Sequence, residues 1–177
     1  MDQISFHQVD NSEERNQAGE LIGEYLTWLN EIVQRKYGLE FEIDAMLQSD
    51  LTHSTKFSPP QGRFYLTRFE GQAAGVGCLK NIGDQTGEIQ RMYVLTEFRR
   101  LGIGRAIVER LIEDARTIGY RWLRLESLEF LDAAHSLYRS VGFEAIDPYA
   151  DNSMRSYQAS ETLDRYHQIT VFMQLEL

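Results

Sequence analysis

The sequence predicts a mixed α/β fold, in which one central sheet carries helices on its faces. Short apolar runs that suit strands are interspersed with longer runs of helical period. A glycine-containing stretch, residues 99–106, joins a β-rich run to a strongly amphipathic one. The order strand, loop, helix, strand that results is typical of a mixed sheet covered by helices.

The N-terminal part predicts a first strand followed by two helices. Residues 4–9 alternate well enough to form a strand, and Asn11 with Glu14 forms a capping box for the next element. Apolar residues then recur at helical spacing as far as Gly38, which predicts one long amphipathic helix. A shorter second helix is expected over residues 43–51.

The middle of the chain predicts a β-hairpin and a central strand. The strands of the hairpin are residues 64–69 and 73–79, and Glu70-Gly71-Gln72 forms the turn between them. A polar turn over residues 81–87 leads to the central strand, residues 88–95.

The remaining elements alternate between helix and strand. An apolar stripe predicts a helix from Ile103 to Ile118, and Gly119 stops it. A strand near residues 122–125, a helix over 132–140 and strands over 143–146 and 169–175 complete the order. The polar stretch between the last two strands, residues 147–168, is long for a loop inside a compact domain, which indicates a functional or mobile segment.

Length and charge limit the class of protein. With 177 residues, 42% of them hydrophobic, the whole chain (1–177) is expected to form a single domain. The net charge of −9 argues against a nucleic-acid binder, because neutralising phosphates needs a concentrated basic surface. An acidic protein mildly favours a positively charged substrate such as an amine. The alternative is that the negative charge only keeps the protein soluble.

Targeting signals, disulfides and metal sites are not expected. The single cysteine, Cys78, lies in an apolar strand and is expected to be a buried, unreactive thiol in a reducing compartment. The first ten residues lack the pattern of a signal peptide, and no apolar run suits a membrane helix, so a cytoplasmic protein without a membrane partner is predicted. The four histidines are scattered, which argues against a metal site; His135 is expected at the surface.

The stretch around Gly102 and Gly104 has the features of an anion-binding turn. Two glycines let the backbone turn with its amides converging, and the helix that follows adds free N–H groups and the positive end of its dipole. A phosphate or pyrophosphate suits such a turn. The dinucleotide pattern G-x-G-x-x-G fails, because Ile107 stands at the third glycine position, and the Gly-Lys-Ser/Thr of a P-loop is missing.

Two motifs resemble the GNAT superfamily of acyl-CoA-dependent N-acyltransferases. The family's coenzyme loop reads Gln/Arg-x-x-Gly-x-Gly/Ala, and Arg99, Gly102 and Gly104 fill these places. Residues 134–143 resemble the family's Ala-x-x-Leu-Tyr-x-x-x-Gly-Phe. The resemblance covers residues 62–146 and implies a mostly antiparallel central sheet, acetyl-CoA as cosubstrate and N-acetyltransferase activity.

The resemblance also implies which residues bind the coenzyme. Backbone amides of the glycine loop would hold the pyrophosphate, and the central strand would offer its backbone to the pantetheine arm and the thioester oxygen at a bulge. The residues concerned are Met92, Val94, Arg99, Arg100, Leu101, Gly102, Ile103, Gly104 and Arg105. The side chains of Arg99 and Arg105 either add charge at the phosphates or are simply solvated.

Two residues are candidates for proton transfer. Tyr138 matches the family tyrosine that protonates the departing thiolate, although a helical tyrosine also suits core packing. An alkylamine is almost wholly protonated at pH 7, so a base or a water path must remove a proton before attack. Glu88 stands where some members place a general base, and burial would raise its pKa; a solvated glutamate at a strand end is the alternative.

The acceptor is expected to be a small amine or an amino-acid-like metabolite, attacked directly in a ternary complex. A protein N-terminus or lysine is an alternative, and a non-catalytic acyl-CoA-binding module is a rival from another class. By resemblance, Tyr25, Trp28 and Tyr37 are either pocket or core residues. The 147–168 stretch is expected to act as a flexible lid that brings Tyr149 and Asp151 near the acceptor. Homodimers are frequent in the family, so a dimer is considered as well.

Overall fold

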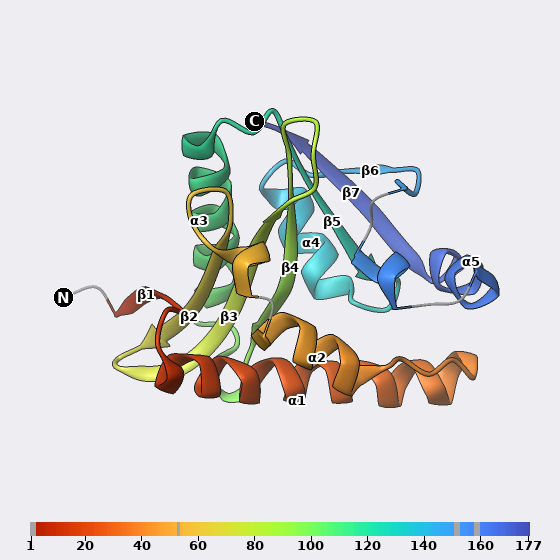
Figure 1. Ribbon diagram of the computed structural model, residues 1–177, viewed down its shortest axis with the longest axis horizontal. Helices are drawn as coiled ribbons and strands as arrows, with labels where there is room; N and C mark the ends of the chain where they lie inside the picture. Colours follow the sequence, from red (N-terminus) through yellow and green to blue (C-terminus); the bar gives the residue numbers. More distant parts are fainter. Residues whose placement is uncertain (1–2, 53, 151–152, 158–159) are drawn as a thin grey trace.

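One seven-stranded sheet runs through the computed structural model, which describes residues 3–52, 54–150, 153–157 and 160–177 (Figure 1). Its strands are β1 (Ile4–Gln8), β2 (Arg63–Phe69), β3 (Gln72–Asn81), β4 (Thr86–Val94), β5 (Trp122–Leu128), β6 (Glu144–Ile146) and β7 (Thr170–Glu176). Their order is β1-β2-β3-β4-β5-β7-β6, and β4 with β5 is the parallel pair among otherwise antiparallel neighbours. This confirms the mixed, mostly antiparallel sheet.

Two helices, α1 (Ser12–Tyr37) and α2 (Ile43–Thr52), follow β1. The Oδ1 atom of Asn11 accepts a 2.9 Å hydrogen bond from the N–H of Glu14, which is the predicted cap. At the other end Gly38 adopts φ +63°, and its N–H bonds to the carbonyl of Gln34. Within the described residues, no helix combines the length and the apolar character needed to cross a membrane.

The other helices divide between the two faces of the sheet (Figure 1). Helices α3 (Ile103–Ile118) and α4 (Asp132–Ser140) pack on the face opposite to α1, whereas Tyr166 of α5 (Ser160–Gln168) joins the core under α1. Strand β2 shows the alternation that this needs: Phe64 and Leu66 face α1, and Tyr65 faces α3. Helices therefore cover both faces, as the sequence predicts.

Helix α3 lies close against β3 at Gly77. A Cβ atom at this position would stand 2.5 Å from Cγ2 of Ile107, closer than real contacts allow. The absence of a side chain at Gly77 therefore lets α3 pack directly on the backbone of β3.

The stretch 147–168 differs from the expected loop. It contains a short 3-10 helix, Ser153–Ser156, as well as α5. Two apolar side chains within it, Met154 and Tyr166, are buried, and the ring of Tyr166 meets that of Phe41 edge to face at 5.8 Å. These few apolar residues dock the described part of the stretch on the face of the sheet that α1 covers. The mainly polar composition of the stretch does not indicate this docking.

Candidate active site

The parallel strands β4 and β5 part halfway along their length. Their ladder ends at the pair Ile89 and Leu125, yet β4 continues to Val94 and β5 continues to Leu128. Beyond that pair the two strands are no longer joined to each other, and a wedge-shaped gap opens in the middle of the sheet.

A β-bulge lies where the strands part. Arg91 adopts φ +53°, and the register between β3 and β4 shifts between Val76 and Cys78. Two residues of β4, Arg91 and Met92, thereby oppose one residue of β3. Because a bulge bends its strand, the rest of β4 follows β3 and leaves β5. The bulge that the family resemblance implies is therefore present.

The bulged end of β4 directs its peptide groups into the gap. The N–H of Leu95 donates to the carbonyl of Ala74, so Gly75 and Val94 form a non-hydrogen-bonded pair between β3 and β4. The N–H and carbonyl of Val94 consequently point away from β3, toward the side where β5 has left. By the alternation of a strand, those of Met92 point the same way.

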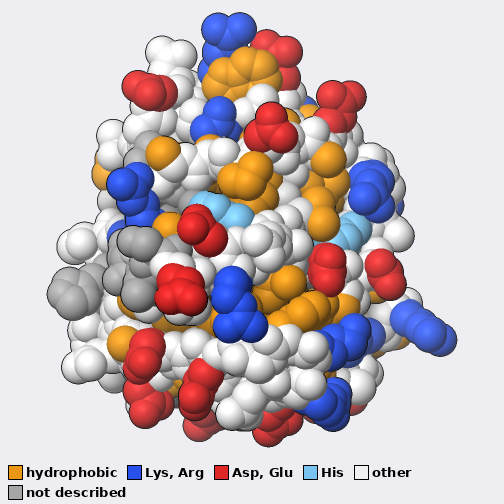
Figure 2. Space-filling view, turned by 90° about the vertical axis from the view of Figure 1, so that its right-hand side faces the viewer, with side chains coloured by type: hydrophobic (Ala, Val, Ile, Leu, Met, Phe, Trp, Pro, Cys, Tyr) orange, Lys and Arg blue, Asp and Glu red, His pale blue; other side chains and the backbone are white. Residues whose placement is uncertain are grey.

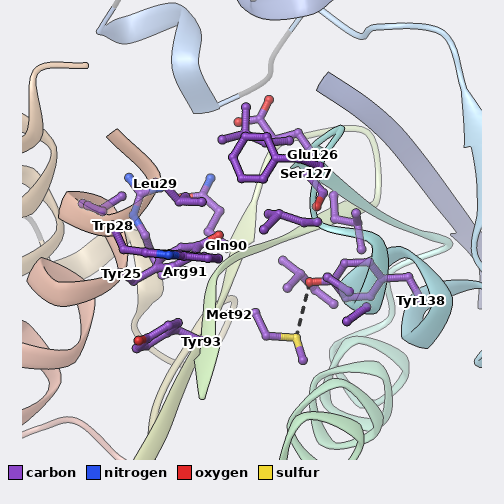
Figure 3. A pocket seen from close by; sticks show the side chains of 18 of the residues that line it. Tyr25, Trp28, Leu29, Gln90, Arg91, Met92, Tyr93, Glu126, Ser127 and Tyr138 are labelled. Atoms are coloured by element: carbon purple, nitrogen blue, oxygen red, sulfur yellow. Dashed lines mark hydrogen bonds between the residues drawn. The ribbon is translucent and has the colours of Figure 1, made fainter. Parts of the chain in front are cut away.

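A cavity of about 460 Å³ lies at the gap. Helix α1 forms one wall and helix α4 the other, so the cavity reaches both faces of the sheet (Figure 3). Most of the lining is apolar or aromatic. Its polar members include Gln90, Arg91, Arg99, Glu126, Ser127, Asp132 and Tyr138. Figure 2 shows hydrophobic side chains at a hollow low on one face of the molecule, with Lys and Arg side chains beside it.

The aromatic residues singled out near the N-terminus divide into two groups. Tyr25 and Trp28 line the cavity, so the pocket interpretation holds for them. Tyr37 does not belong to this lining, and its hydroxyl donates a 2.6 Å hydrogen bond to Glu129. Tyr149 reaches Glu88, as described below, and Asp151 lies outside the described residues.

The glycine loop begins α3 without a side-chain cap. Gly102 is the N-cap at φ +80°, a conformation that costs other residues energy, and it has no side chain with which to bond to the first-turn amides. A Cβ at Gly104 would make only ordinary contacts, the nearest at 3.5 Å with Leu137. The start of α3 thus presents amides next to open space. Leu101, between the arginines and Gly102, is 48% exposed.

The arginines of the loop have different positions. Arg99 lines the cavity, donates from Nε to the carbonyl of Val94 at 3.1 Å, and stacks over the rings of Trp28 and Tyr93. Arg105 donates to Ser140 at 2.8 Å and to Glu109 at 3.2 Å on the outer side of α3. Arg100 adopts φ +65° and is exposed.

Tyr138 lies at the α4 wall of the cavity, next to the bulge. Its side chain is buried, and its hydroxyl donates to the sulfur of Met92 at 3.6 Å (Figure 3). Burial raises the pKa of Tyr138 above the usual value for tyrosine. The hydroxyl therefore stays protonated at neutral pH and stands beside the gap between the strands.

Glu88 is completely buried and does not itself line the cavity. Its Oε1 accepts a hydrogen bond from the amide of Gln90, and its Oε2 accepts one from the hydroxyl of Tyr149 at 2.6 Å. Burial raises the pKa of Glu88, and the two hydrogen bonds oppose that rise. Of the open alternatives, a solvated strand-end glutamate is wrong, because α1 and the 147–168 stretch cover this face.

Sequence reasoning missed three charged residues that line the cavity, Arg91, Glu126 and Asp132. Arg91 bonds through Nε to Asp50 of α2, which also accepts a 2.6 Å hydrogen bond from Lys56. Only the fold brings Arg91 and Asp50 together. Glu126 belongs to an alternating stretch of β5, which gave a weak signal because polar residues in such a pattern usually face water.

His135 corrects one expectation, whereas Cys78 confirms another. His135 is 3% exposed, not at the surface, because α4 turns it toward β5, and its Nε2 lies 3.1 Å from Oγ of Ser127. The sequence did contain a signal for the burial of His135, since His135 and Tyr138 are three residues apart and share one helix face. Cys78 is buried, and burial raises the pKa of its thiol. Among the described residues no cluster suited to a metal ion is found.

Comparison with known proteins agrees with this geometry. A sequence model of the acetyltransferase (GNAT) family matches residues 25–143. An uncharacterized N-acetyltransferase from Dictyostelium discoideum is 46% identical over 65 residues, which are 37% of this chain; the match spans 30% of that protein's length.

Solved structures match over all or nearly all of the chain. An acetyltransferase from Streptococcus agalactiae has a TM-score of 0.73 at 17% identity, with 100% of both chains covered. The PaiA N-acetyltransferase from Thermoplasma acidophilum, in complex with coenzyme A, has a TM-score of 0.69 at 16% identity, with 98% of this chain and 99% of that one covered. At these identities the structures share the fold.

The family model covers more than half of the chain and defines the class to which the protein belongs. The chain belongs to the GNAT family of acetyltransferases.

Proposed function

We propose that this chain, acting as one domain, transfers the acetyl group of acetyl-CoA to the primary amine of a small metabolite by direct attack in a ternary complex. The observation that carries the proposal is the gap between β4 and β5, which opens into a cavity of about 460 Å³ beside Tyr138. This volume is within the range of small-molecule sites. The buried thiol of Cys78, with its raised pKa, argues against a covalent acyl-enzyme.

The residues near the start of α3 fit the diphosphate of the coenzyme. The uncapped first-turn amides and the helix dipole favour an anion there, and the missing side chain of Gly104 leaves room for close approach. The peptide groups of Met92 and Val94 would hold the pantetheine arm and the thioester oxygen at the gap. When bound, acetyl-CoA supplies the acetyl group as an activated thioester.

Tyr138 is proposed as the general acid. Its buried hydroxyl, protonated at neutral pH, would donate a proton to the sulfur that leaves when the acetyl group is transferred. Its neighbour in the protein is the soft sulfur of Met92, a weak acceptor that does not hold the proton strongly.

Glu88 is proposed as the final acceptor of the amine proton. Because Gln90 and Tyr149 occupy its oxygens, the proton would reach it through a hydrogen-bonded path and not by direct contact. Its raised pKa suits this role better than that of an exposed carboxylate. Glu126 lines the cavity and supplies the negative charge that faces the incoming amine.

Release of free thiol from acetyl-CoA tests the proposal. The protein is mixed with acetyl-CoA and a panel of small amines, and with peptides that carry a free N-terminus or lysine. Turnover with small amines supports the proposal. Turnover with peptides alone would show a protein acetyltransferase, and coenzyme binding without turnover on any acceptor would show a binding module.

A further inference from the structure

The guanidinium of Arg91 holds an unused donor at the wall of the cavity. Arg91 is 9% exposed, lies on the α1 side of the cavity beside Tyr25, and lines it (Figure 3). Its Nε bonds to Asp50, whereas its Nη2 is buried without a hydrogen-bond partner among the described residues. Leaving a charged donor buried and unsatisfied is costly, so such a group calls for a ligand.

The carboxylates near Arg91 leave its guanidinium without a second hydrogen-bonded anion. Asp50 is fully buried and is shared between two cations, Arg91 and Lys56. The charge of Glu88 also acts on Arg91, but the oxygens of Glu88 accept hydrogen bonds from Gln90 and Tyr149 and not from the guanidinium. Although burial opposes the charged form of Arg91, Asp50 raises its pKa above the usual value, and Arg91 stays cationic.

Arg99 is the other cation among the described residues that line the cavity, and it has partners. It bonds to the carbonyl of Val94 and stacks over Trp28 and Tyr93. Arg91 is therefore the cavity group best placed to receive an anion. Its planar fork suits a carboxylate in particular.

We propose that Arg91 binds a carboxylate of the acceptor, so that the substrate is an amine that also carries a carboxylate, such as a free amino acid. Arg91 and Met92 are consecutive in the bulge of β4. A carboxylate held by Arg91 would thus place the amine of a short molecule close to the gap where the thioester is proposed to lie. The inference rests on the proposed function and names its substrate class.

Matched acceptors test the inference without any substitution. Free amino acids with apolar, polar and charged side chains are compared with their carboxamides and their decarboxylated amines, in thiol-release assays and in thermal-shift titrations of the protein with coenzyme A. The expected result is at least about a ten-fold preference in kcat/KM and in affinity for the acids, the scale of one hydrogen bond to a charged group.

Two variants separate substrate binding from the structural ion pair. Arg91→Gln should abolish the preference for the acids. Lys56→Gln removes the other cation next to Asp50, lies outside the cavity lining, and should keep the preference even where it lowers stability. If Arg91→Gln does not fold, the wild-type comparison still decides.

The outcomes distinguish this inference from the proposed function. Turnover of amines with no preference for the acids would overturn the role of Arg91 and leave the acetyltransferase assignment to small amines intact. Preferential binding of the acids without turnover would support the role of Arg91 and overturn the proposed reaction.

Discussion

The hydroxyl of Tyr149 donates a 2.6 Å hydrogen bond to Oε2 of Glu88. Tyr149 belongs to the long connection between β6 and β7, and Glu88 belongs to the central strand, so this bond ties the connection to the base of the parted strands. The ring of Tyr149 also packs edge to face on Phe172 of β7 and under the guanidinium of Arg124. The connection therefore takes part in the environment that sets the pKa of Glu88.

Tyr149→Phe should shift the pH dependence of the reaction. The hydroxyl lowers the pKa of Glu88, against the rise caused by burial. Its loss raises that pKa further, so Glu88 becomes protonated at higher pH and the acid limb of the kcat/KM profile moves upward. The measurement is kcat/KM against pH for the variant and the wild type. An unchanged acid limb would remove Glu88 from the proton path.

Three further variants accompany this experiment. Tyr157→Phe changes another tyrosine of the same connection and should leave the acid limb in place. Glu88→Gln should remove the limb altogether, whereas Glu126→Gln should raise KM for the amine, because Glu126 lines the cavity.

Tyr138→Phe should lower kcat with little change in stability. A general acid contributes roughly 10²- to 10⁴-fold, and the hydroxyl makes only a long contact with the sulfur of Met92. Tyr120→Phe is the matched control, because its hydroxyl bonds to the carbonyl of Gln61. That control should reduce the unfolding temperature and spare kcat. Retention of full kcat by Tyr138→Phe would show that water protonates the leaving sulfur.

Local sequence signals predicted the fold well. Asn11 and Gly38 mark the ends of α1 because a cap and a left-handed glycine act on neighbouring residues. Pairings across the chain were out of reach. Asp50 and Arg91 are 41 residues apart and meet only because α2 packs over the bulge of β4. The burial of Met154 and Tyr166 also depends on the α1 face, which composition does not reveal.

In the candidate site, as in the fold, local motifs predicted some residues, such as Tyr138, and contacts across the chain determined the others. The motif of Tyr138 placed it on α4, at the cavity wall, and the glycine-loop motif placed Gly102 at the start of α3. The charged residues of the lining could not be predicted in this way. The periodicity of a strand shows which side chains share a face, but it does not show whether solvent or another element lies over that face. A residue such as Glu126 can therefore face solvent or a cavity.

Gly102→Ala should weaken coenzyme binding specifically. Gly102 has φ +80° at the start of α3, and Gly119 has φ +94° at its end. An alanine in the left-handed region costs about 1–2 kcal/mol, so both variants should lose similar stability. Only the change at Gly102 moves the amides proposed to hold the diphosphate, and it should raise KM for acetyl-CoA. Equal KM values in the two variants would contradict the proposed coenzyme site.

Asp50→Asn should destabilise the fold more than a surface substitution does. Asp50 is fully buried between Arg91 and Lys56, and removing its charge leaves the guanidinium of Arg91 without its counter-ion. Breaking a buried pair in this way costs about 3–5 kcal/mol, measured as the free energy of unfolding in denaturant. Glu109→Gln, which breaks an exposed pair with Arg105, should cost at most about 1 kcal/mol. A carboxylate-bearing acceptor, when added, should restore part of the stability that Asp50→Asn loses, because the ligand would supply the anion that Arg91 has lost. If such ligands give no stabilisation, Arg91 serves the fold alone.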